Sequence, residues 1–122
     1  MNLEEFIRSA LESVDDLRTL LLFYGSPQSE MGAQDIAGKL YLPPATAEQI
    51  LARLHAKGLL ASCGENRRFR YQPASPEVAR LIAEVVELDQ KRPVSLINMI
   101  YPQTREIKAF ADAFRIKKDK EK

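Results

Sequence analysis

The chain has 122 residues, a formal net charge of +1 and one cysteine. This length suits one domain with a continuous core, and 45% hydrophobic and 29% charged residues are ordinary for a soluble globular protein. The lone Cys63 excludes an internal disulfide framework and a multi-cysteine zinc site, and the near-neutral charge argues against tight, indiscriminate nucleic-acid binding.

The first predicted element is a helix over residues 3–23, in which apolar residues recur every three or four positions. Ser13 and the acidic pair Asp15-Asp16 could divide it into two helices, because acidic residues suit a helix N-terminus. The acidic residues near its start are untypical of a secretory signal, and no apolar run reaches the ~20 residues of a membrane span. We therefore expect a cytoplasmic protein without a membrane partner.

A second group of elements follows a polar loop. Met31 is a lone apolar residue of the kind that forms a very short strand, and a short helix is predicted over Ala33–Leu40. The connection Tyr41–Pro44 contains two prolines, of which Pro44 suits the first turn of a helix. That helix is predicted to run from Pro44 to about Lys57 and to stop at Gly58.

The remaining chain predicts a β-hairpin and further helices. Residues 59–63 and 67–71 face each other across Gly64-Glu65-Asn66, which is a hairpin pattern. Ser75 can cap an amphipathic helix over 76–90. An apolar stretch over 94–101 and a last helix over about 102–114 come next, and a polar, basic tail covers 115–122.

These elements predict a mainly α protein with a small β-hairpin, in the α+β class. We expect one domain over residues 1–75, a helical extension over 76–114 and a flexible tail over 115–122.

The stretch GAQDIAGKLYLPPATAEQILARLHAKGLLASCGENRRFRYQ, residues 32–72, carries a family resemblance. Its order of short helix, tight turn, helix ending in Gly-Leu-Leu and hairpin resembles the winged helix-turn-helix regulators of bacteria, including the MarR and ArsR types. The resemblance covers about a third of the chain and implies a winged helix-turn-helix domain with extra C-terminal helices.

The resemblance implies a DNA-binding transcriptional regulator, with the recognition helix 44–57 in the major groove of double-stranded DNA and the hairpin 59–72 on the backbone or minor groove. The candidate contacts on the helix share one face at three- and four-residue spacing, and those on the hairpin are guanidinium groups that suit phosphates. They are Thr46, Gln49, Arg53, Arg67, Arg68 and Arg70.

An alternative is a winged-helix module for protein–protein interaction without DNA binding, because fold does not imply function. The exposed face of the recognition helix has fewer basic and small polar residues than DNA readers usually show. Glu48 would repel phosphate there unless it accepted a hydrogen bond from a cytosine amino group. Gln49 and Arg53 are also explained as ordinary solvated residues.

An enzyme is not expected. The only histidine, His55, lies on a helix without a cysteine nearby in the sequence, and no phosphate loop, metal-ligand spacing or nucleophile motif is present. We predict no catalytic residue, no metal and no cofactor.

The stretch Val94–Tyr101 has no charged residue, so a helix formed by it must be covered. The chain's own core could cover it. The other interpretation is that the C-terminal helices pack against a second copy and form a homodimer that presents two recognition helices. The interface would then contain Val85, Leu96, Ile97 and Ile100.

Overall fold

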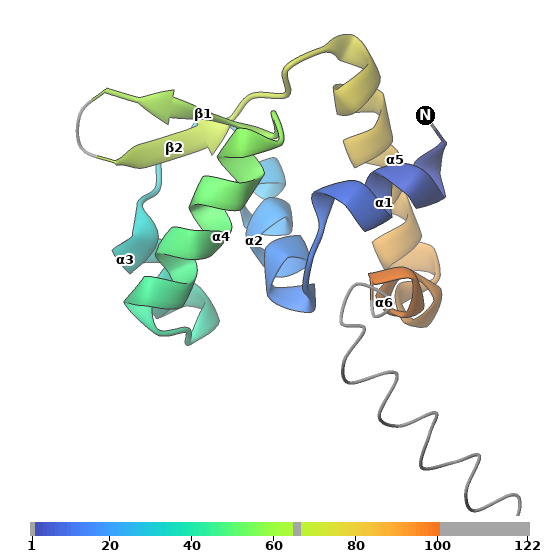
Figure 1. The fold of residues 1–122 in the computed structure, drawn as a ribbon, viewed down its shortest axis with the longest axis horizontal. Coiled ribbons are helices and arrows are strands. Elements are labelled where there is room, and N and C mark those ends of the chain that lie inside the picture. Colours follow the sequence, from blue (N-terminus) through green and yellow to red (C-terminus); the bar gives the residue numbers. More distant parts are fainter. Residues whose placement is uncertain (1, 65–66, 101–122) are drawn as a thin grey trace, which may run out of the picture.

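The computed structural model describes residues 2–64 and 67–100 (Figure 1). This part of the chain is mainly helical with a small antiparallel sheet, which confirms the predicted α+β class. Its elements in chain order are α1 Leu3–Ala10, α2 Val14–Gly25, α3 Ala33–Leu40, α4 Pro44–Ala56, β1 Leu60–Cys63, β2 Arg68–Tyr71, α5 Pro76–Lys91 and α6 Pro93–Ile100. The helix predicted over 102–114 and the tail 115–122 lie outside the described residues.

The first predicted helix is divided at Ser13, into α1 and α2. Leu11 has an extended backbone, and the Ser13 hydroxyl accepts a hydrogen bond from the Asp16 backbone N–H at 3.2 Å, which caps α2. A second bond closes the cap, because a carboxylate oxygen of Asp16 accepts from the Glu12 backbone N–H at 3.2 Å. This cap turns the chain sharply, so that α1 and α2 contact different parts of the molecule.

Helices α3 and α4 form a tightly connected pair that packs on α2. Tyr41 ends α3 in the left-handed conformation with φ of 58°, and Pro44 opens α4. The buried residues of α4 are Ala47, Ile50, Leu51 and Leu54, at the three- and four-residue spacing of one helix face. The opposite face of α4 is left for solvent.

The hairpin follows directly from α4. Gly58 permits the turn, because its φ is 81° and an added Cβ would lie 3.0 Å from the Cβ of Ala74. Strand β1 pairs with β2 in the register Leu60↔Tyr71, and Met31 pairs with Phe69 through N–O distances of 2.8 and 2.9 Å. The hairpin is therefore tied to the segment that leads into α3.

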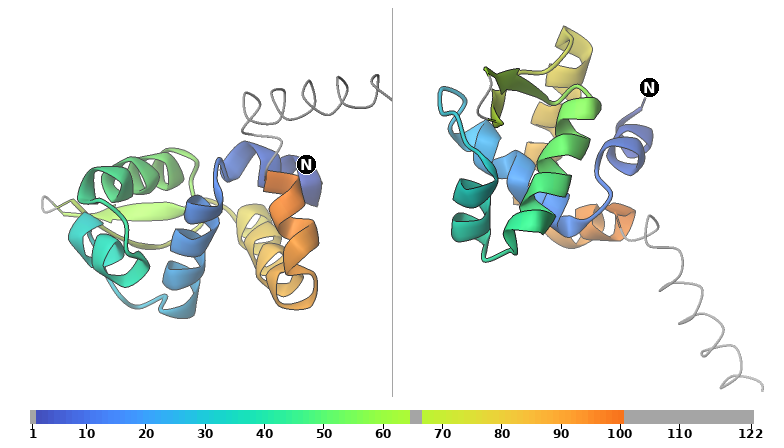
Figure 2. Two further views of the ribbon diagram at one scale, coloured as in Figure 1. Left: turned by 90° about the horizontal axis from the view of Figure 1, so that it is seen from below. Right: turned by 60° about the vertical axis from the view of Figure 1, so that its left-hand side comes forward.

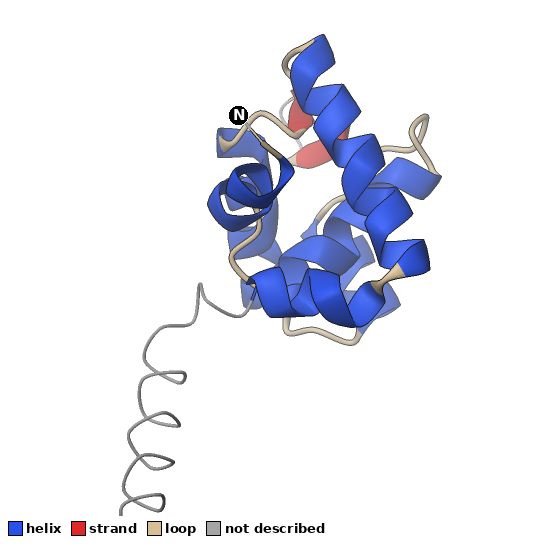
Figure 3. Cartoon of the chain, turned by 90° about the vertical axis from the view of Figure 1, so that its right-hand side faces the viewer, coloured by secondary structure: helices blue, strands red, loops and turns tan. Residues whose placement is uncertain are grey.

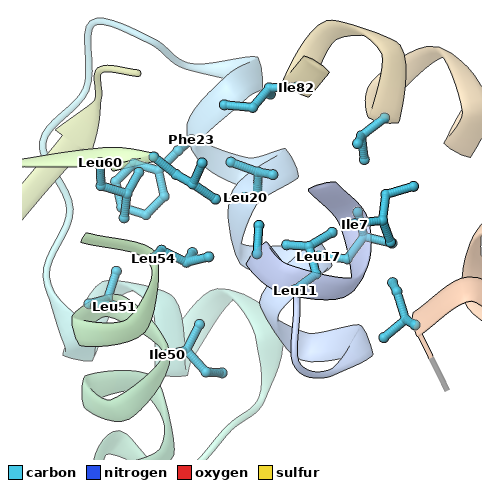
Figure 4. Packing of buried hydrophobic residues seen from close by; sticks show 14 of the residues in the cluster. Ile7, Leu11, Leu17, Leu20, Phe23, Ile50, Leu51, Leu54, Leu60 and Ile82 are labelled. Atoms are coloured by element: carbon cyan, nitrogen blue, oxygen red, sulfur yellow. The ribbon is translucent and has the colours of Figure 1, made fainter. Parts of the chain in front are cut away.

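The C-terminal helices pack against the first helix. Helices α5 and α6 contact each other and both contact α1, so the two ends of the described chain lie together (Figures 2 and 3). Buried side chains run continuously from the hairpin through α4 and α2 to α1 (Figure 4). Ile7, Leu11, Leu20 and Ile82 belong to this single cluster, so the described residues before position 76 share a core with those that follow it.

Three residues that we predicted at a dimer interface are buried in the core of the chain. Val85 and Leu96 are 0% exposed and Ile100 is 1% exposed, whereas Ile97 is half-buried. Leu96 and Ile100 are covered within the same chain, because α6 packs against α1 and α5 and the hydrophobic core extends onto these helices. Val85, Leu96 and Ile100 are thus not available at the surface, and homodimerisation stays a prediction that needs other residues.

Candidate nucleic-acid interface

A surface groove of about 990 Å³ lies between the beginning of α3, the exposed face of α4 and the hairpin. We call it the α4–hairpin groove. Its lining includes Gly32, Gln34 and Asp35 from the α3 side, Ala45, Glu48, Gln49 and Ala52 from α4, and Arg67, Arg68 and Phe69 from the hairpin. The groove combines the two elements that the sequence proposed as a DNA-binding surface.

The exposed face of α4 has mostly small side chains and little charge. All of α4 belongs to the described part of the chain, and its exposed residues include no lysine or arginine. Ala45 and Ala52 are one turn before and one turn after Glu48, and Gln49 lies beside it. Glu48 and Gln49 are thus the two long polar side chains that α4 contributes to the groove.

Arg53 lies on the flank of α4 that faces α2, where it is paired within the chain, and its role as a DNA contact stays a prediction. Its Nη2 donates to Oδ1 of Asp16 at 2.7 Å and its Nε donates to Oδ2 of the same carboxylate at 3.2 Å. Asp16 is 0% exposed. The pairing raises the pKa of Arg53, first through the hydrogen bond to Asp16 and against the effect of burial. Arg53 therefore joins α4 to the cap of α2.

The same flank holds a second ion pair and the half-buried Thr46. Nζ of Lys57 donates to a carboxylate oxygen of Glu12 at 2.8 Å, and Glu12 also lies 3.8 Å from Nε of Arg53. Thr46 does not line the groove. Thr46, Gln49 and Arg53 thus do not lie on one exposed face of α4. Of the three, Gln49 alone lines the groove.

The three hairpin arginines differ in how strongly other residues of the chain hold them. Arg68 is held, because it donates to Asp35 at 3.2 Å and to the backbone oxygen of Glu30 at 2.6 Å. Arg67 is 87% exposed in its side chain and lies 3.8 Å from Glu48. Arg70 is exposed and donates to the side-chain oxygen of Gln72 at 3.0 and 3.3 Å. Arg67 and Arg70 can reach an external anion with little loss of internal bonding.

Residues 32–35 also line the groove, and we did not predict them as site residues. The Asp35 carboxylate accepts from the Gly32 backbone N–H at 2.9 Å and from Arg68, so it fixes the start of α3 against the hairpin. The acidic residue in the first turn of a predicted helix was the available signal, since such residues commonly satisfy the free N–H groups there.

Tyr71 anchors the hairpin on α2 through an edge-to-face contact with Tyr24, with ring centroids 5.5 Å apart. Burial raises the pKa of Tyr71 above its ordinary 10.0, and the negative charge of an ionised Tyr24 raises it further. The neutral phenol is therefore favoured in the folded state.

We expect Tyr71 to make the chain less stable in alkali. A raised folded-state pKa gives a stabilisation that is complete below the unfolded-state pKa of about 10 and is lost as the pH rises beyond it. Urea unfolding between pH 8 and pH 11 should show a steeper alkaline decrease in the wild type than in Tyr71→Phe. Tyr41→Phe, at a position that is 92% exposed, is the control. Equal slopes in wild type and Tyr71→Phe would contradict the assignment.

Other kinds of site find no support in the described residues. No three His, Cys, Asp or Glu side chains among them lie close enough together to hold a metal ion. His55 is exposed and its ring lies 5.4 Å from that of Phe69, and Cys63 is half-buried and free. None of the helices that the structure describes has the length and apolar character required to cross a membrane.

The α4–hairpin groove thus brings the exposed face of α4 and the arginines of the hairpin onto one surface. Its walls come from segments that are far apart in the sequence, and its charged groups are paired across it. Comparisons of the chain with protein-family models, with curated proteins and with solved structures found no match.

Proposed function

We propose that this protein binds double-stranded DNA as a winged helix-turn-helix regulator, with α4 in the major groove and the β1–β2 hairpin on the adjacent backbone. The observation that carries the proposal is the exposed face of α4, which borders the α4–hairpin groove opposite Arg67. An α-helix fits the major groove of B-DNA, where each base pair presents a distinct pattern of donors and acceptors.

The order of the elements supports this proposal. Met31 pairs with Phe69 beside the two-stranded sheet, so that a short extended segment, two helices and a hairpin follow one another as in a winged helix. Helix α3 braces α4 on one side, and the ion pair of Arg53 with Asp16 braces it on another. A recognition helix needs such support, because its side chains must meet the bases in a fixed register.

The arginines divide into two roles under this proposal. Arg67 and Arg70 are exposed on the hairpin and would contact phosphates, which position the protein without reading sequence. Arg68 would hold the hairpin against α3, through Asp35 and the Glu30 backbone. Gln49, exposed in the groove, would face the bases, where a glutamine can pair with adenine through two hydrogen bonds.

The salt dependence of DNA binding tests the proposal. Each phosphate contact contributes about −0.9 to the slope of log K against log salt concentration. Fluorescence anisotropy with a labelled duplex should therefore give a slope about 1 unit shallower for Arg67→Ala and for Arg70→Ala.

Arg80→Ala is the matched control, because Arg80 is an exposed arginine on α5 and does not line the groove. Its slope should equal that of the wild type. A wild-type chain that binds no duplex at 50 mM salt would refute the proposal.

A second candidate function is recognition of a protein, and the balance of charge in the groove favours it. Glu48 and Asp35 face Arg67 and Arg68 across the groove, and Leu51 and Phe69 add apolar surface between them. Such a mixed lining is typical of protein interfaces more than of phosphate-binding surfaces. Absence of DNA binding, together with an unchanged fold of Arg67→Ala, would favour this candidate.

A further inference from the structure

We infer that Glu48 makes the site selective for duplexes that present a cytosine to α4, so that it is a specificity-determining residue. This inference rests on the proposed DNA-binding function and adds the base that the groove selects. Glu48 places a carboxylate on the helix face that would approach the polyanion, where it repels phosphate unless a donor meets it.

Glu48 occupies a prominent place on α4. Ala45 and Ala52, on the neighbouring turns of the same face, have no atoms beyond Cβ, so they allow the helix backbone to approach a flat partner closely. The Glu48 side chain is 59% exposed and extends beyond them. A base edge that meets this face of α4 therefore meets the Glu48 carboxylate.

The partner that the structure gives Glu48 holds it weakly. Oε1 of Glu48 lies 3.8 Å from Nη1 of Arg67, and both side chains are largely exposed. Exposed ion pairs of this kind contribute little to stability. Arg67 can thus move to a phosphate and leave Glu48 free for a base, and the positive charge beside Glu48 reduces its repulsion from the DNA backbone.

The chemistry of a carboxylate then selects the base. An ionised carboxylate only accepts hydrogen bonds, so in the major groove it can pair only with an exocyclic amino group, of cytosine or of adenine. Guanine and thymine present acceptors that repel it. Adenine also presents the acceptor N7 beside its amino group, whereas cytosine presents its amino group alone. Cytosine is therefore the favoured partner.

The negative charge of Glu48 also lowers the affinity for DNA sequences that present no amino group to it. Where no amino group faces Glu48, the carboxylate loses its hydration and gains no partner, which lowers the affinity. Glu48 should consequently weaken non-specific binding while it allows binding at a matching site.

Selection from a randomised duplex library tests the inference with three variants. The wild-type motif should contain a cytosine whose replacement lowers the affinity about tenfold, the usual effect of one lost base contact. Glu48→Ala should lose this preference and bind random duplex more tightly. Glu48→Gln should shift the preference from cytosine to adenine, because an amide can both donate to N7 and accept from the amino group. Glu87→Gln makes the same charge change at an exposed position on α5 and should keep the wild-type motif.

A chemical variant of the DNA completes the test. N4-methylcytosine at the selected position replaces the amino hydrogen that faces the major groove, and it should weaken wild-type binding but not that of Glu48→Ala. A common motif for wild type and Glu48→Ala would overturn the role of Glu48 and leave DNA binding intact. If the wild type selects no motif and binds no duplex, the proposed function fails, and the role of Glu48 fails with it.

Discussion

Replacement of Arg53 by alanine should lower the free energy of unfolding by about 3 kcal/mol, because it leaves a buried carboxylate without its cation. Asp16 is 0% exposed and receives both bonds of the guanidinium, at 2.7 and 3.2 Å. The remaining donors to Asp16, the Ser13 hydroxyl and the Glu12 backbone N–H, are neutral and do not replace the lost charge. Urea unfolding followed by circular dichroism measures the effect.

A double-mutant cycle separates this pair from general damage to α4. In an Asp16→Asn background the side chain at position 16 carries no charge, so the further change Arg53→Ala should cost about 1 kcal/mol or less. Gln49→Ala, an exposed change on the same helix, should stay within about 0.5 kcal/mol of wild type. An Arg53→Ala variant with wild-type stability but weakened DNA binding would contradict this structural role and support Arg53 as a DNA contact.

Truncation of Leu96 to alanine should also destabilise the chain strongly, by about 3 kcal/mol, because it opens a cavity in the shared core. Leu96 is 0% exposed and lies on α6, which packs against α1 and α5. The loss should appear as a lower urea midpoint that does not depend on protein concentration, since the contacts are made within one chain.

Val94→Ala on the same helix is the matched control, because Val94 is 69% exposed and its truncation should change the stability little. If Leu96 instead stabilised a dimer, the midpoint of the wild type would rise with protein concentration, and truncation of Leu96 would produce folded monomers whose midpoint does not. Analytical ultracentrifugation of wild type and Leu96→Ala distinguishes these results.

The boundaries of the elements were accessible from the sequence because single residues set them. The predicted helix over Ala33–Leu40 is confirmed, and the helix that opens at Pro44 ends at Ala56, one residue before the prediction. The cap at Ser75 is formed, with the hydroxyl accepting from the Val78 backbone N–H at 3.2 Å. Prolines, glycines and capping residues act on their immediate neighbours, so their effects can be predicted without the tertiary structure.

The role of Arg53 could not be predicted in this way, because its partner is 37 residues away. Helical spacing groups side chains by direction, but it does not say which edge of a face another helix will cover. The pattern Ser13-x-x-Asp16 was the one local sign, since it is typical of a capping box and places a carboxylate at a fixed helix start.

Which residues cover the C-terminal helices could not be predicted from the sequence either. The apolar character of Val94–Tyr101 predicted that a helix there must be covered, but an apolar surface is satisfied equally by its own chain or by a second copy. Leu96 and Ile100 are buried by their own chain because α1 separates from α2 at Ser13 and can then contact α5 and α6. Residue types alone do not give the direction in which α1 leaves that turn.

The contact between α1 and the C-terminal helices sets an order of events during synthesis of the chain. The segment from α2 to the hairpin is complete once Tyr71 has left the ribosome, whereas α1 completes its contacts with α5 and α6 only after α6 has emerged. At ordinary elongation rates this delay is roughly 1–6 s. During that interval the nascent chain displays Phe6 and Ile7 to its surroundings, so a chaperone that binds exposed apolar helices would find its target in α1.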